Sequence, residues 1–207
     1  MPIVAASRLG AFISTPTAVR RLALRGALGF AVGALAGLAV LLLFEDGWIG
    51  LPLGMATTGA VGPLMFLRWI PEGLPRLKAV LGFAFGFIFS SFFLIVCMFA
   101  VWGRTLFALP LIVLLSGAGF WLGGYIGGWS IEDRFARRSG RAFAIGGFVG
   151  GPFLVFALYG LAETPATSTI FTPWLLLSIP AGLIPFVLGG ALFGAALARA
   201  RAPSPTV

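Results

Sequence analysis

The 207-residue chain is 59% hydrophobic and only 10% charged, and its mean hydropathy is +1.07. A soluble domain carries about 25% charged residues, so this chain has too little charge to cover a water-facing surface. The composition therefore excludes a soluble globular protein and predicts an all-α, polytopic integral membrane protein. The net charge of +8 does not indicate nucleic acid, because the basic residues flank apolar segments and are placed to contact anionic lipid headgroups.

Six segments are long and apolar enough to cross a bilayer, which takes about 20 residues. They are residues 22–44, 49–67, 79–101, 106–128, 142–162 and 173–198. Thr15 and Pro16 are expected to start the first helix, and the proline-rich residues 69–78 interrupt the chain after the second. We expect one membrane domain over residues 1–207, made of an N-terminal cytoplasmic segment at 1–21, a six-helix bundle at 22–198 and a disordered cytoplasmic tail at 199–207.

The basic residues predict the orientation of this bundle. With the N-terminus inside, 13 of the 14 lie on the cytoplasmic side and only Arg104 lies outside, as the positive-inside rule requires. An even number of spans places both termini in the cytoplasm, and we expect a multi-pass protein of the plasma membrane, the inner membrane of a bacterium. Five tryptophans fall at predicted span ends, where this side chain is enriched: Trp48, Trp69, Trp102, Trp129 and Trp174.

Small residues recur every four positions in all six predicted spans, as in Gly29, Gly33 and Gly37 of the first and Gly119, Gly123 and Gly127 of the fourth. This spacing lines one face of a helix with small side chains and lets a neighbouring helix approach closely. The pattern predicts an internally packed bundle. The alternative is a face that binds a second copy of the chain or a foreign subunit.

A repeated motif suggests three tandem helix hairpins. The pentapeptides GFAVG at 29–33, GFAFG at 82–86 and GFVGG at 147–151 lie early in the first, third and fifth spans. Because Gly-Phe pairs also occur elsewhere in the chain, chance matches are the alternative explanation.

The ionisable residues argue against an enzyme. All six acidic residues lie outside the predicted spans, histidine is absent and Cys97 is the only cysteine. Proton relays and catalytic centres inside a membrane normally need an ionisable side chain within a span, and a nucleophilic serine needs a base. The sequence therefore predicts a non-enzymatic protein with no metal site and no cofactor.

Polar and helix-breaking residues inside the spans are the candidate functional positions. Two prolines flank a glycine in SIPAGLIPFVLGG, residues 178–190, and each proline removes a backbone hydrogen bond from the sixth helix. A broken helix near mid-membrane is typical of a transporter site, whereas a simple kink is the alternative. The residues expected to line a substrate path are Thr57, Thr58, Ser116, Ser178, Pro180 and Pro185. Ordinary helix-to-helix hydrogen bonds are the other interpretation of the hydroxyls.

The polar segment at 130–141 carries four arginines, Arg134, Arg137, Arg138 and Arg141. Ser130 and Asp133 have the spacing of a capping box, and we expect a short helix lying in the inner headgroup layer, with the arginines on anionic lipids. The alternatives are a purely topological signal or a site for a cytoplasmic partner.

These features favour a small transporter-like protein or permease subunit that moves a neutral or apolar solute. The alternative is an accessory or assembly subunit that packs against a larger membrane complex. Expected partners are membrane lipids, including anionic ones, together with other membrane subunits or a second copy of the chain. A transporter predicts a polar pocket between the second, fourth and sixth spans, whereas an accessory subunit predicts a solid interior and a glycine-lined outer face.

Overall fold

A computed structural model describes residues 16–44, 47–67, 76–102, 108–162 and 173–200. These residues form six α-helices, and no strand occurs among them. The helices are α2 (Pro16–Leu43), α3 (Gly47–Leu67), α4 (Arg76–Trp102), α5 (Ala108–Ile131), α6 (Asp133–Ala162) and α7 (Pro173–Ala200). Each is long and apolar enough to span a membrane, which confirms the predicted all-α bundle of six spans. Of the N-terminal segment expected at 1–21, residues 16–21 belong to α2, and of the tail expected at 199–207, residues 199–200 belong to α7. The remainder of both segments lies outside the described residues.

The largest boundary difference concerns the arginine-rich segment. The sequence predicts a fifth span at 142–162 that follows a separate interfacial helix, but α6 runs unbroken from Asp133 for 30 residues. Its first turns are amphipathic, because Phe135, Ala136 and Ser139 are buried while the arginines are exposed. Because these residues are buried against α5, the helix extends beyond the hydrocarbon core of the membrane. At 1.5 Å per residue α6 is about 45 Å long, compared with a hydrocarbon core of about 30 Å.

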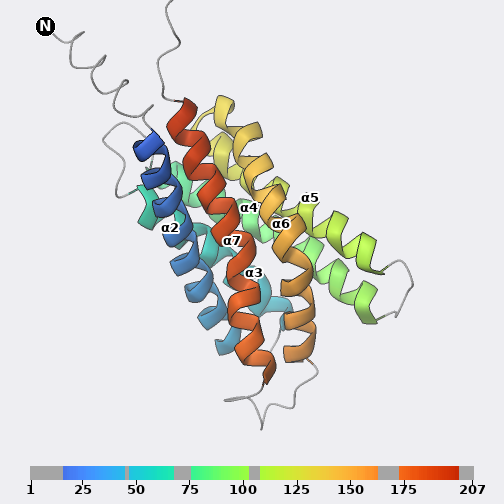
Figure 1. Cartoon of the computed structure of the whole chain (residues 1–207). Coiled ribbons are helices and arrows are strands. Elements are labelled where there is room, and N and C mark those ends of the chain that lie inside the picture. Colours follow the sequence, from blue (N-terminus) through green and yellow to red (C-terminus); the bar gives the residue numbers. More distant parts are fainter. Residues whose placement is uncertain (1–15, 45–46, 68–75, 103–107, 163–172, 201–207) are drawn as a thin grey trace, which may run out of the picture.

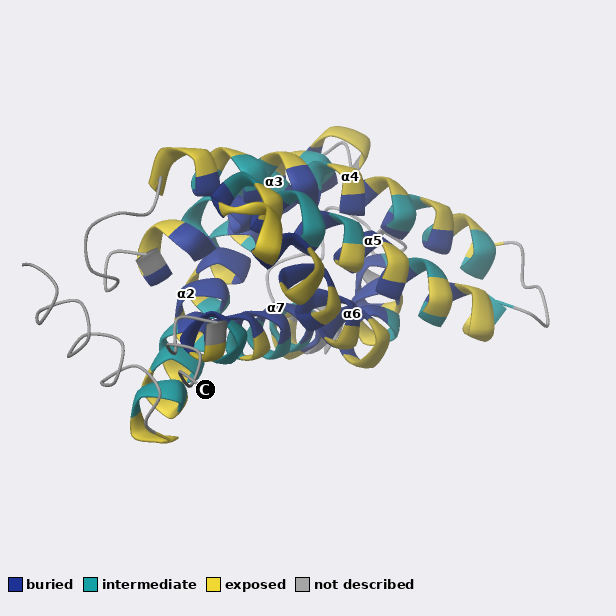
Figure 2. Ribbon diagram, turned by 90° about the horizontal axis from the view of Figure 1, so that it is seen from above, coloured by how far each residue is buried: buried dark blue, intermediate teal, exposed yellow. Residues whose placement is uncertain are grey.

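The six helices form a closed ring in chain order. Each helix packs against the next one along the chain, and α7 packs back against α2. Neighbours run antiparallel, so α2, α4 and α6 begin at the same end of the molecule at which α3, α5 and α7 end (Figure 1). Seen from above, the buried residues lie mostly toward the middle of the bundle and the exposed residues toward its outside (Figure 2).

Phenylalanine rings fill the centre of this ring. Phe30 of α2, Phe83 of α4 and Phe143 of α6 contact one another, with centroid distances of 5.5, 4.9 and 5.7 Å for the pairs 30–83, 30–143 and 83–143. Phe87 lies against all three of these rings, and Phe193 lies against Phe83 and Phe143. All five side chains are buried. A central passage between the helices is therefore closed by aromatic side chains.

The glycine ladders lie at helix-to-helix contacts inside the bundle. Gly33 of α2 faces the backbone of Thr58 and Gly62 on α3, and Gly86 of α4 faces Gly123 of α5. Gly26 of α2 and Gly190 of α7 lie against each other in the same way, which closes the ring. The small-residue spacing therefore serves internal packing, as the bundle interpretation predicts.

Three successive hairpins make equivalent contacts, but not in the register that the pentapeptides suggest. Phe30 packs on Gly62 of the following helix, Phe83 on Gly127 and Phe143 on Gly189. The third equivalent of GFAVG and GFAFG is therefore AFAIG at 142–146. The predicted match at 147–151 places Phe148 at an exposed position, so that alignment is wrong by five residues.

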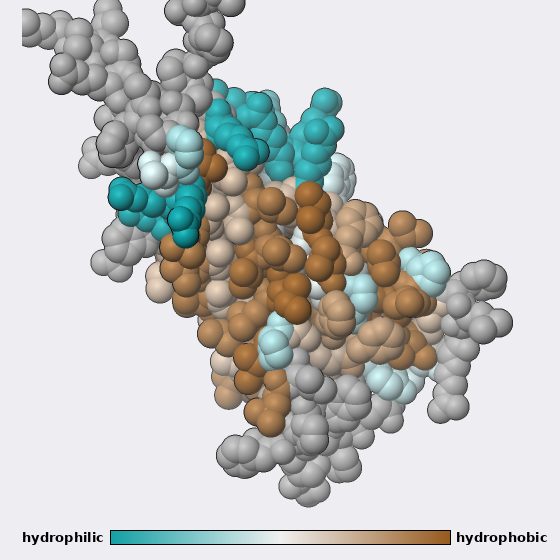
Figure 3. Space-filling model, viewed as in Figure 1, coloured by the Kyte–Doolittle hydropathy of each residue, from teal (hydrophilic) through white to brown (hydrophobic). Residues whose placement is uncertain are grey.

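Among the described residues, the charged side chains lie at one end of the bundle, which we call the basic end. The described basic residues lie at the starts of α2, α4 and α6 and in the last turn of α7. Figure 3 shows hydrophilic side chains gathered there and a hydrophobic surface over the body of the bundle. Below, the far half denotes the half of the bundle opposite this end.

Candidate functional site: an apolar pocket in the far half

A pocket opens in the far half of the bundle between four helices. It leaves about 40 Å³ in which a water-sized sphere can be placed. Its walls come from α2, α3, α6 and α7, whereas α5 contributes none. The lining residues are Ala34, Gly37, Leu38, Leu41, Leu51, Gly54, Met55, Thr58, Leu154, Leu158, Gly182 and Phe186.

Small side chains create the pocket, and a phenylalanine closes its inner end. Gly37 and Gly54 bring α2 and α3 into backbone contact at one wall. Gly182 of α7 has open space beside it, because a Cβ added there would meet only the Cδ1 atom of Leu154 at 3.8 Å. At the inner end Phe186 stacks edge-on against Phe87 and Phe120, at centroid distances of 5.4 and 5.1 Å. The aromatic core thus forms the floor of the pocket.

The pocket offers almost no hydrogen-bonding capacity. Thr58 is its single hydroxyl-bearing residue, and that hydroxyl donates to the carbonyl of Gly54 one turn earlier, at 3.0 Å. The remaining lining side chains are aliphatic, aromatic, thioether or absent. A polar ligand group would lose its bonds to water here without replacement, which costs roughly 1–3 kcal/mol or more. The site is chemically suited to an apolar ligand.

The structure does not bring the predicted hydroxyls together. Thr57 lies on α3, is partly exposed and donates to the carbonyl of Leu53 at 2.8 Å. Ser116 is fully buried between α5 and α6, with its hydroxyl 3.1 Å from the carbonyl of Gly147. Of the three proposed hydroxyl residues whose side chains are described, Thr57, Thr58 and Ser116, Thr58 lines the pocket. The polar pocket expected between the second, fourth and sixth spans is instead apolar and lies between α2, α3, α6 and α7.

The proline pair lies within a continuous α7. Pro180 is exposed, whereas Pro185 is buried where α6 and α7 cross, against Gly146 and Gly150. The side chain of Ser178 lies outside the described residues. The two prolines frame Gly182, and together with Phe186 this glycine forms the α7 wall of the pocket. Neither proline lines the pocket, and the α7 lining residues Gly182 and Phe186 were not among the predicted site residues.

A further hydroxyl and a thiol join α4 to α5. Ser90 donates from α4 to the carbonyl of Gly119 on α5 at 2.7 Å. The Cys97 sulfur lies 3.8 Å from the carbonyl of Ile112. Both are buried. They fasten the α4–α5 hairpin, which is the structural role expected of mid-membrane hydroxyls.

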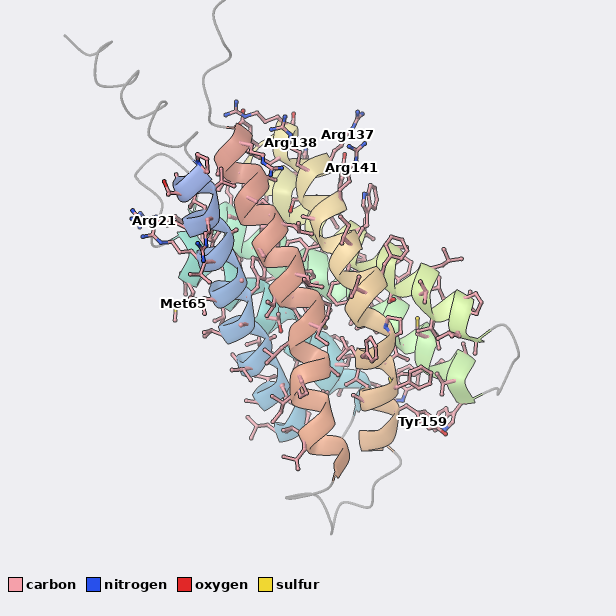
Figure 4. The ribbon with its side chains drawn as sticks, viewed as in Figure 1. Arg21, Met65, Arg137, Arg138, Arg141 and Tyr159 are labelled. Atoms are coloured by element: carbon pink, nitrogen blue, oxygen red, sulfur yellow. The ribbon has the colours of Figure 1, made fainter. Side chains whose placement is uncertain are left out.

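The arginines of α6 lie at the basic end, on the side of the helix away from α5. Figure 4 shows Arg137, Arg138 and Arg141 there, at the same end as Arg21, while Tyr159 marks the far end. Arg134 pairs with Glu132 at 2.7 Å, and both side chains are about half exposed. The predicted capping box is wrong, because Ser130 still belongs to α5 and bonds to the carbonyl of Gly127.

The geometry defines a six-helix membrane bundle with a closed aromatic centre and an apolar pocket in its far half. Among the described residues, no three His, Cys, Asp or Glu side chains lie close enough to hold a metal ion. No family model matches the chain, no curated protein is similar to it, and no solved structure matches its fold.

Proposed function

We propose that the protein is a small, non-enzymatic transporter-like protein or permease subunit that handles a neutral or apolar solute. The observation that carries this proposal is the apolar pocket between α2, α3, α6 and α7. Its walls lack charged groups, so a charged substrate would have no partner there. No nucleophile–base pair borders it, which supports binding rather than chemistry.

We propose that a movement of α7 converts the closed pocket into a passage through the bundle. Pro180 and Pro185 each remove a backbone hydrogen bond from this helix, which lowers the cost of bending it. A bend between the two prolines would displace Gly182 and Phe186, which form one wall and the floor. The centre is closed by Phe186, Phe87 and Phe120 in the described arrangement, so transport requires such a change.

The accessory-subunit alternative receives less support. It requires a flat outer face of small residues, whereas the glycine ladders described above lie at internal contacts. The exposed residues of α4 are bulky instead: Phe85, Phe89, Phe92 and Phe99. Such a surface suits lipid chains as well as it suits a second subunit or another copy of the chain, so it does not favour a protein partner.

The charge distribution supports an orientation with the basic end in the cytoplasm, and a bacterial inner membrane as the location. The exposed arginines Arg134, Arg137, Arg138 and Arg141 line the start of α6, where they can contact anionic headgroups. Because α6 is longer than the hydrocarbon is thick, these side chains reach the headgroup layer as part of the spanning helix.

The orientation can be checked by thiol labelling. Single cysteines replace Arg137 and Glu163 in a Cys97→Ala background. Position 137 is expected to react with a membrane-impermeant maleimide only after the cells are opened, because the basic end faces the cytoplasm. Position 163, beyond the end of α6, is expected to react in intact cells. The reverse pattern would refute the orientation.

Mass spectrometry of the purified protein tests the proposed function. Protein extracted in a mild detergent is expected to retain a neutral or apolar small molecule that Gly182→Leu, which fills the pocket, does not retain. Gly182→Ala is the matched control, since it adds one methyl group and leaves most of the pocket open. Identical small-molecule contents in the wild type and in Gly182→Leu would contradict the proposal.

A further inference from the structure

We infer that the pocket holds the end of a hydrocarbon chain belonging to a lipid-like amphiphile, whose polar headgroup stays at the membrane surface on the far side. This inference rests on the proposed function and narrows its substrate to one chemical class. The argument depends on the shape, depth and polarity of the pocket.

The residues that line the pocket extend over about two turns of α2 and of α3. Its α2 wall runs from Ala34 to Leu41, and its α3 wall from Leu51 to Thr58. Seven residues of helix correspond to about 10 Å. A free volume of about 40 Å³ spread over this length leaves a thin channel. An apolar cavity of about 150 Å³ accepts benzene, so the smaller volume here favours a chain of single methylene groups over an aromatic ring.

The depth of the pocket matches the reach of a chain from the surface. Leu41 lies two residues before the end of α2, and Leu51 lies in the second turn of α3, so the outer end of the pocket is near the far membrane surface. Its floor at Phe186 lies against the aromatic core of the bundle. A chain entering at Leu41 would therefore point inward toward Phe186, as a lipid tail does.

The polarity of the pocket excludes the headgroup. The hydroxyl of Thr58 is already bonded to Gly54, and no other lining side chain can bond a phosphate, sugar or amine. A headgroup is expensive to bring into such surroundings, but it remains hydrated at the surface if only the tail enters. Anchoring at the surface also keeps the tail at high effective concentration beside the pocket.

Photo-crosslinking in lipid nanodiscs tests this inference. The probe is a phosphatidylethanolamine with a diazirine at the end of one acyl chain, and a second probe carries the diazirine beside the ester. The chain-end probe is expected to label Leu38 and Met55 at least tenfold more than the ester probe does. Gly182→Leu is expected to lower that labelling about tenfold, and Gly182→Ala to retain most of it. A tenfold excess of dodecane is expected to leave most of the labelling, since dodecane has no anchored headgroup.

Three results would overturn the inference. They are equal labelling of Leu38 and Met55 in the wild type and Gly182→Leu, equal labelling by the two probes, or loss of labelling in dodecane, which would indicate a free hydrocarbon. Retention of a co-purified small molecule by the wild type, without chain-end labelling, would also refute the lipid chain. That last result would leave the proposed function standing, so the two failures can be told apart.

Discussion

Gly33→Leu is expected to lower the stability of the bundle by about 3 kcal/mol, the upper range for an overpacking substitution. A Cβ at this position would lie 2.7 Å from the carbonyl oxygen of Thr58 and 2.9 Å from the nitrogen of Gly62. Both atoms belong to the backbone of α3, so the clash can be relieved only by moving the helices apart. Thermal unfolding in detergent, followed by helical circular dichroism, measures the effect.

Gly182→Leu is the matched control, because it makes the same substitution where the space is open. It is expected to unfold at the wild-type temperature or above, since replacing a helical glycine adds about 0.5–1 kcal/mol of helix propensity. Gly123→Leu is also expected to be destabilising, because a Cβ there would meet the Ser90 hydroxyl and the ring of Phe87, which is buried in the aromatic core. Equal unfolding temperatures for Gly33→Leu and Gly182→Leu would mean that the α2–α3 contact is misplaced.

Phe143→Ala is expected to cost about 3–5 kcal/mol, the usual range for deleting a buried ring. Phe143 lies within 5.7 Å of the ring centroids of Phe30, Phe83 and Phe87. No neighbour can fill the resulting cavity without breaking other edge-to-face contacts, so the loss combines ring burial and aromatic pairing.

Phe153→Ala provides the comparison on the same helix. Its ring is 59% exposed and faces the lipid side, so its removal is expected to change the free energy of unfolding by less than about 1 kcal/mol. Denaturation of both variants in the same detergent gives the difference. Similar losses for Phe143→Ala and Phe153→Ala would contradict a central aromatic core.

The six spans could be predicted from the sequence because each span depends on local properties. Runs of apolar residues, prolines between them and the positions of the arginines predict six helices without knowledge of any contact. The start of α6 was missed for the opposite reason. The charges of Arg134 and Arg137 indicate a separate helix in the headgroup layer, but Phe135 and Ser139 are buried against α5. Only this tertiary contact shows that the helix is continuous with the span.

The pocket could not be located from the sequence because its walls come from four distant segments. In the sequence the glycines that line the pocket cannot be told from many others. Gly37 and Gly54 have the common four-residue spacing, and Gly182 lies in a proline-flanked stretch. Only their arrangement leaves Gly182 without a close neighbour while Gly37 and Gly54 meet each other. The partners of the hydroxyl groups could not be predicted from the sequence either. Ser116 donates to the carbonyl of Gly147 on the neighbouring helix, whereas Thr58 donates to a carbonyl within its own helix.

Transport through the pocket is tested most directly by flux in reconstituted vesicles. The molecule that co-purifies with the wild type is isotopically labelled, and its movement across proteoliposome membranes is timed for the wild type, Gly182→Ala and Gly182→Leu. The proposed function predicts flux above that of protein-free vesicles for the wild type and Gly182→Ala, and a loss of at least tenfold for Gly182→Leu. Flux that is unchanged in folded Gly182→Leu, or no greater than in protein-free vesicles for the wild type, would contradict it.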